Sequence, residues 1–406
     1  MMMKRIVMKF GGTSVANPER ISRAARLVVE EVRCGHEVAV VVSAMGKSTD
    51  ELLALAGEVN SQADRREIDM LLATGEQVTA SLLAMAISAE GVPARSYTGW
   101  QAGVTTESIH GNARIEQVHA DKIIAAIESG SVAVVTGFQG VDDKGELTTL
   151  GRGGSDTSAV AISIAIDAAV CDIYTDVEGV FTTDPRLIGQ AKKLEEIAYD
   201  EMLEIANLGA GVLHPRAVEF AKNHQIPLRV RPAHKDGVGT IIKEEIDLEN
   251  NLIVRGIAFE RDIVRITVMY DMPFNGSLAN IFTALAHHHI NVDIIVQTIM
   301  EGVQPSVSFS IKKEDFAEVI NLLEKEKEVL GYSRADFEVG LAKVSIVGSG
   351  MVSNPGVAAQ MFDTLRIASI PVKMVSTSEI KVSVVVPEPE MENAVAVLHE
   401  TFGLHV

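Results

Sequence analysis

Residues 6–14, Ile-Val-Met-Lys-Phe-Gly-Gly-Thr-Ser, place two adjacent glycines directly after a short apolar run. A helical pattern follows from about Pro18 to Val32, so residues 9–14 are expected on a turn between a strand and a helix. Adjacent glycines let a ligand approach the backbone, and the N–H groups of such a turn can cradle an anion. Lys9 could neutralise charge on a transferring phosphoryl group there. The stretch suggests phosphate chemistry, although it matches neither the Walker loop nor the dinucleotide fingerprint, and similar turns are often purely structural.

Composition and charge narrow the class of protein. At 406 residues with 47% apolar side chains, the chain can form two or three domains with buried cores. The formal net charge of −19 argues against nucleic acids and anionic membranes as main partners. No apolar run is long enough to span a bilayer, no signal peptide is evident, and the two cysteines have no disulfide-framework or metal-ligand spacing. We therefore expect a cytoplasmic protein.

Up to about residue 240, apolar β-branched runs alternate with helical patterns. The expected strands are 37–43, 131–136, 171–174 and 228–231, and the expected helices are 22–33, 49–60, 77–90, 121–128 and 157–168. Nearly continuous apolar strands between helices predict a parallel or mixed sheet covered on both faces. The helix at 157–168 is apolar almost all round, so it should be deeply buried. The polar stretch at 232–250 indicates a domain boundary.

An internal repeat follows this boundary. The first copy has glycine, alanine and apolar positions that recur 80 residues later: Gly276, Ala279, Phe282, Leu285, Ile290 and Val292 return as Gly356, Ala359, Phe362, Leu365, Ile370 and Val372. Each copy follows the order of a βαββαβ unit, whose helices cover one face of its sheet. Duplicated small modules behind a larger α/β domain suggest a sensor attached to an enzyme; the alternative is a dimerisation device.

Two further segments place polar side chains beside small residues. Ser43 follows an apolar strand and Thr49 begins the next helix, so their hydroxyls could contact a carboxylate or phosphate, although Thr49 could equally be a helix N-cap. Thr74-Gly75-Glu76 is expected at a helix start, where a carboxylate is favoured by the helix dipole alone. The functional interpretation is that Glu76 holds a substrate ammonium.

The stretch 151–156, Gly-Arg-Gly-Gly-Ser-Asp, is more specific. Three glycines around Arg152 open the buried helix, so backbone N–H groups and a guanidinium should face the same space. A guanidinium can bind a carboxylate through two parallel hydrogen bonds. Asp156 is expected on the first turn, near Arg152. Because burying such polar groups is costly without partners, this stretch predicts a ligand site.

A turn-rich loop at 174–186 follows the strand 171–174. It carries hydroxyl, acidic and basic side chains at the carboxyl end of that strand, where open α/β sheets bind ligands. A nucleotide would fit there. His214, before a helix, and the consecutive His287, His288 and His289 are better explained by structure, since three histidines in a row on a helix cannot face one metal.

Taken in order, the motifs KFGGTS, VVSAMGKSTDEL, TGE, TTLGRGGSD, IYTDVEGVFTTDPR, VLHPRAVE and MVSTSEI resemble those of the aspartokinases, in the amino acid kinase family. The resemblance covers the whole chain, because the repeat resembles a tandem pair of ACT domains, and it is closest to monofunctional, lysine-regulated enzymes of Bacillus-like bacteria. It implies an α/β fold, a carbamate kinase-like three-layer sandwich at 1–245, followed by ferredoxin-like ACT domains at 264–340 and 341–406. The strand 252–259 would pair into the second ACT domain.

The resemblance also implies a reaction, in which MgATP phosphorylates the side-chain carboxylate of L-aspartate on the route to lysine, threonine and methionine. Lys9 and Asp156 would be catalytic: Lys9 would stabilise charge on the phosphoryl group, and Asp156 would orient Lys9 and neighbouring groups. The implied substrate-binding residues are Ser43, Thr49, Glu76, Arg152, Gly153, Gly154 and Ser155. The implied nucleotide-binding residues are Lys9, Phe10, Gly11, Gly12, Ser155, Thr175, Asp176, Phe181, Thr182, Thr183, Asp184, Pro185 and Arg186. Mg²⁺ would be bound through the nucleotide, and no metal site of the protein's own is implied.

The ACT pair would bind an amino-acid effector, either lysine alone or lysine with threonine. The implied effector-binding residues are Asn275, Gly276, Asn291, Val292, Asp293, Ile294, Gln297, Val352, Ser353 and Asn354, with Asp293 suited to an ammonium. Pro273 stands where the family's turn often has Asp, and Gly211 where several relatives have Lys. The resemblance further implies a homo-oligomer through the ACT domains, with an ACT-only second subunit in some relatives. A kinase for acetylglutamate or glutamate, and a catalytically silent amino-acid sensor, remain as alternatives.

Overall fold

The computed structural model describes residues 3–207, 212–244, 253–271, 277–300 and 302–405. The chain forms two compact units. The described residues among Met1–Phe181, Lys193–Asn207 and Gly211–Leu248 form the first unit, and those among Thr182–Lys192 and Glu249–Val406 form the second. The expected catalytic segment at 1–245 is therefore interrupted, since a short excursion at Thr182–Lys192 packs with the second unit.

The first unit is built on an eight-stranded sheet with the order β10-β12-β11-β9-β1-β2-β6-β3. Its strands are β1 (Arg5–Phe10), β2 (Glu37–Val42), β3 (Ala94–Tyr97), β6 (Val132–Thr136), β9 (Val170–Thr175), β10 (Glu196–Ala198), β11 (Leu228–Pro232) and β12 (Thr240–Lys243). The central strand β1 pairs in parallel with both β2 and β9. All pairings in this sheet are parallel except that between β11 and β12. The expected mixed sheet of nearly continuous apolar strands is thus confirmed.

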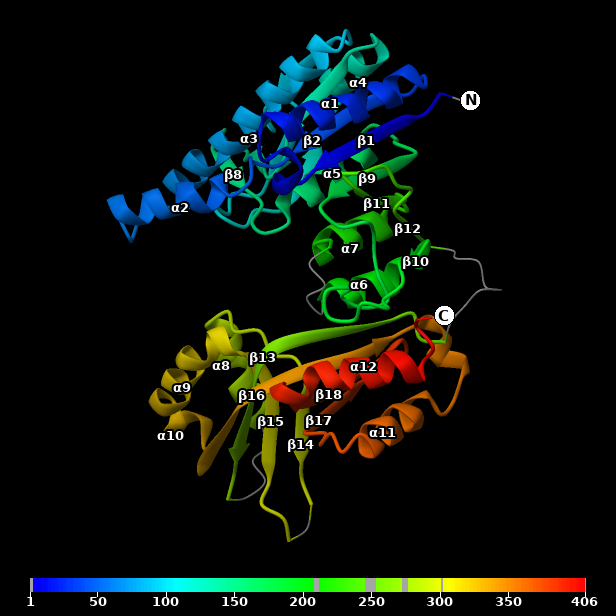
Figure 1. The fold of residues 1–406 in the computed structure, drawn as a ribbon. Coiled ribbons are helices and arrows are strands. Elements are labelled where there is room, and N and C mark those ends of the chain that lie inside the picture. Colours follow the sequence, from blue (N-terminus) through cyan, green and yellow to red (C-terminus); the bar gives the residue numbers. More distant parts are fainter. Residues whose placement is uncertain (1–2, 208–211, 245–252, 272–276, 301, 406) are drawn as a thin grey trace. The chain divides into compact units, whose positions relative to one another are not determined.

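Helices cover both faces of this sheet, as Figure 1 shows for the first unit. They are α1 (Pro18–Arg33), α2 (Ser48–Val59), α3 (Arg65–Ala89), α4 (Asp121–Glu128), α5 (Gly154–Ala165), α6 (Tyr199–Asn207) and α7 (Pro215–Asn223). Along β1, Met8 and Phe10 pack into a core with residues of α1 and α3, whereas Lys9 points to the opposite face, toward α5. Residues 154–163 of α5 are all buried, as its apolar sequence predicted.

Two features of this unit were not expected from the sequence. A small sheet with the order β5-β4-β7-β8 is formed by β4 (Val104–Thr106), β5 (Ile115–Val118), β7 (Gln139–Val141) and β8 (Leu147–Thr149). Helix α3 begins at Arg65 rather than near residue 77, so Glu76 lies in its middle and the helix-start interpretation of Glu76 was wrong. The glycine at position 75 obscured the helix, because glycine is unfavourable within one.

Helix α3 is long and apolar enough, by length and composition, to cross a membrane. However, half of its most apolar stretch is buried within the unit, and it carries the buried carboxylates of Asp69 and Glu76 on its inner face. Ala80, Leu83, Ala84 and Ile87 of this helix pack in the core beside the sheet, as apolar residues of a core helix in a globular domain do. We therefore assign α3 to the core.

The second unit holds one six-stranded sheet with the order β14-β15-β13-β16-β18-β17. The strands are β13 (Gly256–Met269), β14 (Ile295–Thr298), β15 (Ser306–Lys312), β16 (Arg334–Val347), β17 (Met374–Thr377) and β18 (Lys381–Pro387). The helices are α8 (Ser277–His287), α9 (Phe316–Lys325), α10 (Lys327–Leu330), α11 (Val357–Ile367) and α12 (Met391–Thr401). They form two cores on the sheet, one for each copy of the repeat.

The long strands β13 and β16 join the two copies of the repeat. The first half of β13 pairs with the second half of β16, from Gly256 opposite Val347 to Glu260 opposite Lys343. The second half of β13 pairs with the first half of β16, and a register irregularity separates the two halves. The second copy, 341–406, therefore takes up a strand, Gly256–Glu260, that precedes the first copy in sequence, so the two copies share one sheet.

The excursion Thr182–Lys192 is anchored within the second unit. The carbonyl oxygen of Thr182 accepts a hydrogen bond from the backbone N–H of Ile257 at 2.7 Å. The Thr182 hydroxyl lies 3.0 Å from Nε2 of His399, and Leu187 and Ile188 pack against the core of the second repeat. The backbone of this segment is thereby fixed to the six-stranded sheet of the second unit.

Candidate active site

Lys9, at the end of β1, forms the central ion pair of the site. Its Nζ lies 2.5 Å from Oδ1 of Asp156, which sits on the first turn of α5, and both side chains are largely buried. The sequence pattern placed Asp156 near Arg152 and the resemblance placed it beside Lys9; in the structure its ionic partner is Lys9. A buried ion pair of this kind holds the ammonium in one position.

The glycines after β1 hold the adjacent backbone in a narrow space. A Cβ on Gly11 would lie 3.5 Å from Nζ of Lys9, so the ammonium stands over this turn. A Cβ on Gly12 would lie 2.8 Å from the carbonyl oxygen of Ala44, and the Gly12 carbonyl accepts a hydrogen bond from the N–H of Gly46 at 3.0 Å. The turn after β1 and the turn after β2 are therefore locked together beside Lys9.

Arg152 lies on a turn that only glycines can form. Gly151 and Gly153 adopt left-handed φ angles of 73° and 69° on either side of it. A Cβ on Gly153 would lie 2.1 Å from Cγ of His214, so this histidine packs directly on the turn. Arg152 is exposed and has no ionic or hydrogen-bond partner among the described residues. Its guanidinium is therefore available to a carboxylate ligand.

His214 has the structural role that its sequence position predicts. It caps α7, because Nδ1 accepts a hydrogen bond from the backbone N–H of Arg216 at 3.3 Å. Burial lowers the pKa of His214 below its usual value. This cap requires an unprotonated Nδ1, and the lowered pKa favours the unprotonated ring.

Glu76 is a buried carboxylate with one unused oxygen. Oε1 accepts a hydrogen bond from the backbone N–H of Ala44 at 3.0 Å, whereas Oε2 is buried without a hydrogen-bond partner. The residue is 2% exposed, and burial raises the pKa of Glu76 to about 7. A buried acceptor without a donor is costly, so the site is suited to a ligand ammonium.

Sequence reasoning missed Asp69, two turns before Glu76 on α3. This fully buried carboxylate accepts hydrogen bonds at 3.0 Å from the backbone N–H groups of Gly111 and Thr149, and at 2.5 Å from the Thr149 hydroxyl. Nδ1 of His110 lies 3.0 Å from the same carboxylate. Thr149 ends β8, just before the Arg152 turn, so Asp69 ties that turn to the helix that carries Glu76.

Arg216 is a second anchor of the Arg152 turn that the sequence did not reveal. Its guanidinium donates hydrogen bonds to the carbonyl oxygens of Leu150 at 3.1 Å and Ala113 at 2.9 Å. Neither anchor could be found from spacing, because the contacts join residues 41 to 103 positions apart. The only sequence signal is a charged residue within an apolar helical pattern.

The remaining substrate-side residues lie at neighbouring strand ends. Ser43 follows β2, whose last residue pairs with Thr136 at the end of β6, and the Thr136 hydroxyl is buried without a hydrogen-bond partner. A Cβ on Gly137 would lie 2.8 Å from Cβ of Ser155, so these strand ends meet the start of α5. Thr49 lies inside α2 after Lys47, and its interpretation as the N-cap was wrong.

The residues expected to bind the nucleotide do not all belong to one unit of the chain. Thr175 and Asp176 end β9, next to β1, and the Thr175 hydroxyl donates to Oδ1 of Asp176 at 3.2 Å. Phe10 stacks on Tyr174 with ring centroids 4.8 Å apart. Phe181 belongs to the first unit, whereas the other expected residues, Thr182, Thr183, Asp184, Pro185 and Arg186, belong to the excursion that packs with the second unit.

Within that excursion, Asp184 and Arg186 engage each other. Nε of Arg186 lies 3.0 Å from Oδ1 of Asp184, and Nη2 lies 2.8 Å from Oδ2. Hydrogen bonding to Arg186 lowers the pKa of Asp184 below its usual value. This pair stabilises the turn itself, because Oδ1 also accepts the backbone N–H of Arg186 at 2.9 Å.

The comparisons with known proteins decide the family. The amino acid kinase family model matches residues 4–232, and an ACT domain model matches residues 344–402. An aspartokinase of Bacillus sp. (strain MGA3) is 58% identical over 98% of this chain and 97% of its own length. The chain belongs to the aspartokinases of the amino acid kinase family.

Solved aspartokinase structures have the same fold. The chain superposes on E. coli aspartokinase III in complex with aspartate and ADP (R-state) with a TM-score of 0.81 and 26% identity, covering 98% of this chain and 99% of that one. The same enzyme in complex with lysine and aspartate (T-state) gives a TM-score of 0.78 and 27% identity at the same coverage. The expected kinase fold followed by ACT domains is confirmed.

The ACT residues expected at the effector site include one paired carboxylate. Asp293 forms an ion pair with Lys343, whose Nζ also lies 2.8 Å from Oε2 of Glu260. Lys343 is buried, whereas the Asp293 side chain is half exposed. Ile294 is buried, Asn291 and Gln297 are exposed, Val292 is half-buried, and Val352 is exposed.

Three of the expected effector residues lie outside what the structure describes. Asn275 and Gly276, with the Pro273 turn, fall among the undescribed residues, as does the side chain of Ser353. Asn354, next along the chain, donates from Nδ2 to the carbonyl oxygen of Gly350 at 2.8 Å. Asp293 is therefore the acidic residue among the expected effector-binding residues that the structure describes.

Proposed function

We propose that the chain transfers the γ-phosphoryl group of MgATP to the side-chain carboxylate of L-aspartate, giving 4-phospho-L-aspartate. The enzyme class is ATP:L-aspartate 4-phosphotransferase, as family membership indicates. The observation that carries the proposal is Oε2 of Glu76, a buried carboxylate oxygen without a hydrogen-bond partner among the described residues. Oε1 of the same residue accepts the backbone N–H of Ala44, in the turn that also packs against Gly12. An ammonium receptor thereby adjoins the phosphate cradle and Lys9.

The three charged groups of aspartate match three features of the site. Glu76 would receive the ammonium, and Arg152 would bind a carboxylate through its fork of N–H groups. Ser43, Thr49 and Ser155, with the N–H groups of Gly153 and Gly154, would add hydrogen bonds. The remaining carboxylate would then face the Lys9–Asp156 pair.

Such a reaction needs positioning and charge neutralisation rather than a general base. The attacking carboxylate carries no proton at neutral pH, so no side chain has to remove one. Lys9 would stabilise negative charge on the transferring group, and Asp156 would hold Lys9 in place. We assign the nucleotide to Phe10, Gly11, Gly12, Thr175, Asp176 and Phe181, together with the segment 182–186.

Mg²⁺ would be bound through the nucleotide phosphates and would neutralise their charge. Among the described residues, no group of three or more His, Cys, Asp or Glu side chains could hold a metal ion. Of the two carboxylates Asp156 and Asp176, Asp156 is paired with Lys9, whereas Asp176, directly after β9, is exposed and has no ion-pair partner among the described residues.

For regulation, we propose that lysine, alone or with threonine, inhibits through the ACT domains. The E. coli aspartokinase III structure in its T-state contains lysine. In this chain the ammonium of an effector would compete with Lys343 for Asp293. Asp293→Ala should relieve inhibition without changing the uninhibited rate, and unchanged inhibition would remove Asp293 from the site.

We also propose that the enzyme is a homo-oligomer assembled through the ACT sheet, in the cytoplasm. Both edge strands of that sheet, β14 and β17, carry exposed aliphatic residues: Ile295, Val296 and Val375. Unpaired edge strands with apolar side chains are prone to pair with another chain, here a second copy or an ACT-only subunit. Light scattering after size exclusion would test this, and a monomer at micromolar concentration would refute it.

The direct test of function is hydroxamate formation with MgATP and L-aspartate, titrated with lysine, threonine and both. Turnover that falls with lysine supports both halves of the proposal. Turnover with acetylglutamate or glutamate instead of aspartate would show that another amino acid is the phosphoryl acceptor. No turnover, with intact lysine binding by calorimetry, would favour a catalytically silent sensor.

A further inference from the structure

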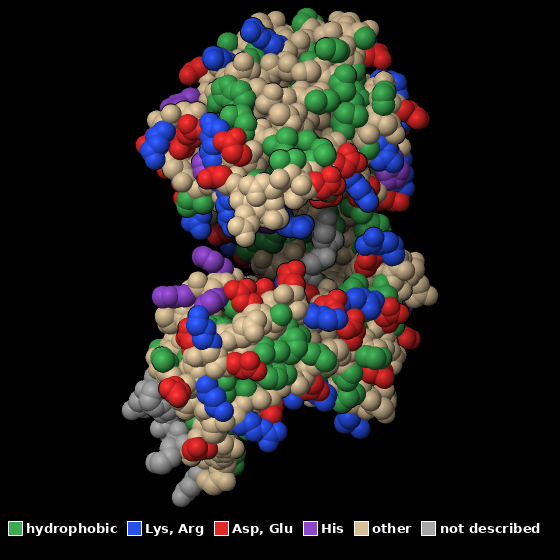
Figure 2. All heavy atoms as spheres, turned by 90° about the vertical axis from the view of Figure 1, so that its left-hand side faces the viewer, with side chains coloured by type: hydrophobic (Ala, Val, Ile, Leu, Met, Phe, Trp, Pro, Cys, Tyr) green, Lys and Arg blue, Asp and Glu red, His purple; other side chains and the backbone are tan. Residues whose placement is uncertain are grey.

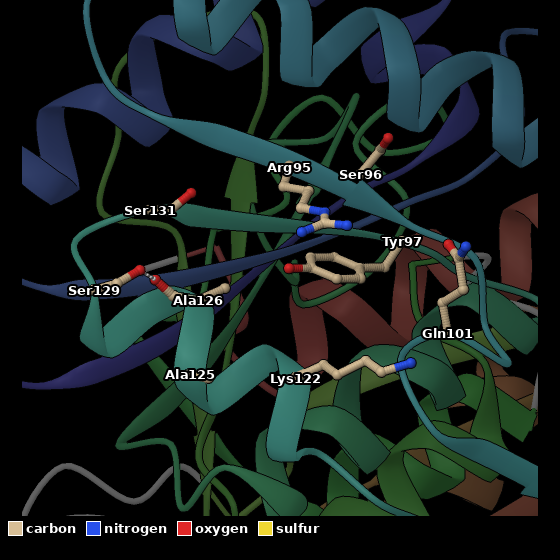
Figure 3. Close-up of a pocket in the computed structure, with 9 residues that line it drawn as sticks. All are labelled: Arg95, Ser96, Tyr97, Gln101, Lys122, Ala125, Ala126, Ser129 and Ser131. Atoms are coloured by element: carbon tan, nitrogen blue, oxygen red, sulfur yellow. Dashed lines mark hydrogen bonds between the residues drawn. The ribbon is translucent and has the colours of Figure 1, made fainter.

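A pocket of about 560 Å³ lies at the free edge of the large sheet in the first unit. Figure 3 shows it between the edge strand β3, helix α4 and the turn that joins α4 to β6. Its lining residues are Arg95, Ser96, Tyr97, Gln101, Lys122, Ala125, Ala126, Ser129 and Ser131. None of them belongs to the kinase site described above.

The charge of this pocket is opposite to that of the protein. It is lined by two cations, Arg95 and Lys122, and by no carboxylate, in a chain with a net charge of −19. By contrast, Lys and Arg side chains are interspersed with Asp and Glu on the face shown in Figure 2. Among the described residues, neither Arg95 nor Lys122 has an ion-pair or hydrogen-bond partner.

Arg95 is nevertheless held in position. Its guanidinium carbon lies 5.5 Å from the centre of the Tyr97 ring, within the range of a cation–π contact. In Figure 3 the guanidinium lies over the ring, which leaves its N–H groups directed into the pocket. A prepositioned guanidinium loses less conformational entropy on binding an anion.

Tyr97 supplies a second, independent sign of a ligand. The residue is only 8% exposed, yet its hydroxyl has no hydrogen-bond partner in the described part of the chain. Figure 3 shows the hydroxyl directed into the pocket, toward the Ala126 side. A phenol that is buried except at a cavity needs a partner inside that cavity.

The remaining polar groups of the pocket are mainly donors. Oε1 of Gln101 accepts the backbone N–H of Thr98 at 3.0 Å, so its NH₂ group remains for a ligand. Ser129 donates its hydroxyl proton to the carbonyl oxygen of Ala126 at 2.7 Å, whereas Ser131 has no such partner among described residues. The set therefore offers two cations, an amide NH₂ and hydroxyls.

We propose that this pocket binds a small phosphate monoester. A dianionic phosphate would satisfy both cations, and its three terminal oxygens would accept from the guanidinium fork, the ammonium and the hydroxyls. A single carboxylate would neutralise only one of them. The pocket volume lies within the range of small-molecule sites and leaves room for the organic part of the ester.

The chain carries its own reporter for a test. Trp100 is the single tryptophan, is 39% exposed and precedes the lining residue Gln101. We would titrate the full-length enzyme with glycerol 3-phosphate, inorganic phosphate, sulfate and glycerol at constant ionic strength, following Trp100 fluorescence and heat by calorimetry. Saturable binding of glycerol 3-phosphate, at least tenfold tighter than sulfate and absent for glycerol, is expected.

Variants separate this site from the kinase site. Arg95→Ala/Lys122→Ala should weaken glycerol 3-phosphate binding at least tenfold, and Tyr97→Phe should weaken it several-fold. Arg26→Ala/Arg33→Ala, which removes the same charge from α1, and Lys9→Ala, which disables the kinase site, should leave the binding unchanged. Turnover should persist in the Arg95/Lys122 variant.

Three results would overturn the proposal. They are no heat and no fluorescence change with the wild-type enzyme, binding that Arg95→Ala/Lys122→Ala leaves intact, and binding lost in Lys9→Ala. Equal, weak responses to sulfate, phosphate and ester that vanish at about 0.15 M salt, where charges are screened beyond about 8 Å, would indicate an adventitious ion only.

Discussion

A Cβ on Gly75 would lie 2.8 Å from Cβ of Ala44. This closeness lets helix α3 pack against the turn after β2, so that the backbone N–H of Ala44 reaches Oε1 of Glu76. A glycine inside a helix costs stability, and here the cost is explained by the close approach. The TGE motif is thus a packing device that positions a carboxylate.

We expect Gly75→Ala to raise the KM for aspartate several-fold. The added methyl group must push α3 away from Ala44, and overpacking of this kind costs about 1–3 kcal/mol, partly offset by about 1 kcal/mol of better helix propensity. Initial-rate kinetics and urea unfolding would measure both effects.

Gly57→Ala is the matched control, because Gly57 lies in α2 with nothing within 4 Å of an added Cβ. It should stabilise the fold by roughly 0.5–1 kcal/mol and leave the KM unchanged. Equal KM values for Gly75→Ala and the wild type would refute the positioning role of the contact.

The raised pKa of Glu76 predicts how aspartate binding varies with pH. Burial raises the pKa to about 7, so at pH 6 most of the free enzyme carries a neutral Glu76 that attracts an ammonium weakly. The KM for aspartate should therefore fall as pH rises through 7 and level off above 8. Glu76→Gln should remove this dependence and raise the KM throughout.

The same shift has a consequence for stability with a definite sign. A carboxyl whose pKa is higher in the folded enzyme than in the unfolded chain favours folding in its protonated form. The contribution of Glu76 to the free energy of unfolding should therefore decline as pH rises from about 4.5 to about 7. Glu76→Gln, compared with wild type by urea unfolding at pH 5 and pH 8, isolates this difference.

The sequence predicted those parts of the fold that depend on local pattern. Alternating apolar runs and helices predicted the central sheet, and the 80-residue repeat predicted the regulatory modules. The predicted helix around Gly75 was too short, because glycine is unfavourable inside a helix. The contact that explains this glycine is with Ala44, a residue more than thirty positions away. The pairing of the strand before the first repeat with the second repeat is equally non-local, and it was expected only from the resemblance, not from the local pattern.

For the site, the sequence could name residues but not their partners. From the residues alone Asp156 was expected near Arg152, and only the resemblance linked it to Lys9, with which it pairs because α5 packs against β1. Asp69 was overlooked, because one acidic residue in a helical pattern has no local signature of burial. The excursion at Thr182–Lys192 was assigned to the catalytic segment, because nothing in its sequence shows what it packs against.

Lys9→Ala should lower kcat by two to three orders of magnitude, corresponding to about 3–4 kcal/mol of lost charge stabilisation. Asp156→Asn should lower kcat less, because Lys9 is still present but loses the partner that fixes its position. Single-turnover phosphoryl transfer measures the step directly. Retained turnover in Lys9→Ala would contradict the role of Lys9, and unchanged binding of the effector would show that the fold is intact.

Asp69→Asn should raise the KM for aspartate about tenfold or more while changing the KM for ATP little. The amide keeps the shape of the carboxylate but offers one acceptor oxygen in place of two, so the N–H and hydroxyl donors of Gly111 and Thr149 cannot all be satisfied. An unsatisfied buried group costs about 1–3 kcal/mol and should loosen the turn that carries Arg152.

Thr149→Val provides the control for this last effect. It removes the hydroxyl donor but keeps the backbone N–H bond to Asp69, so it should destabilise the enzyme with a smaller change in the KM for aspartate. A purely structural role for Asp69 would lower stability and raise both KM values in parallel. A selective rise for aspartate would instead show that Asp69 acts through the Arg152 turn.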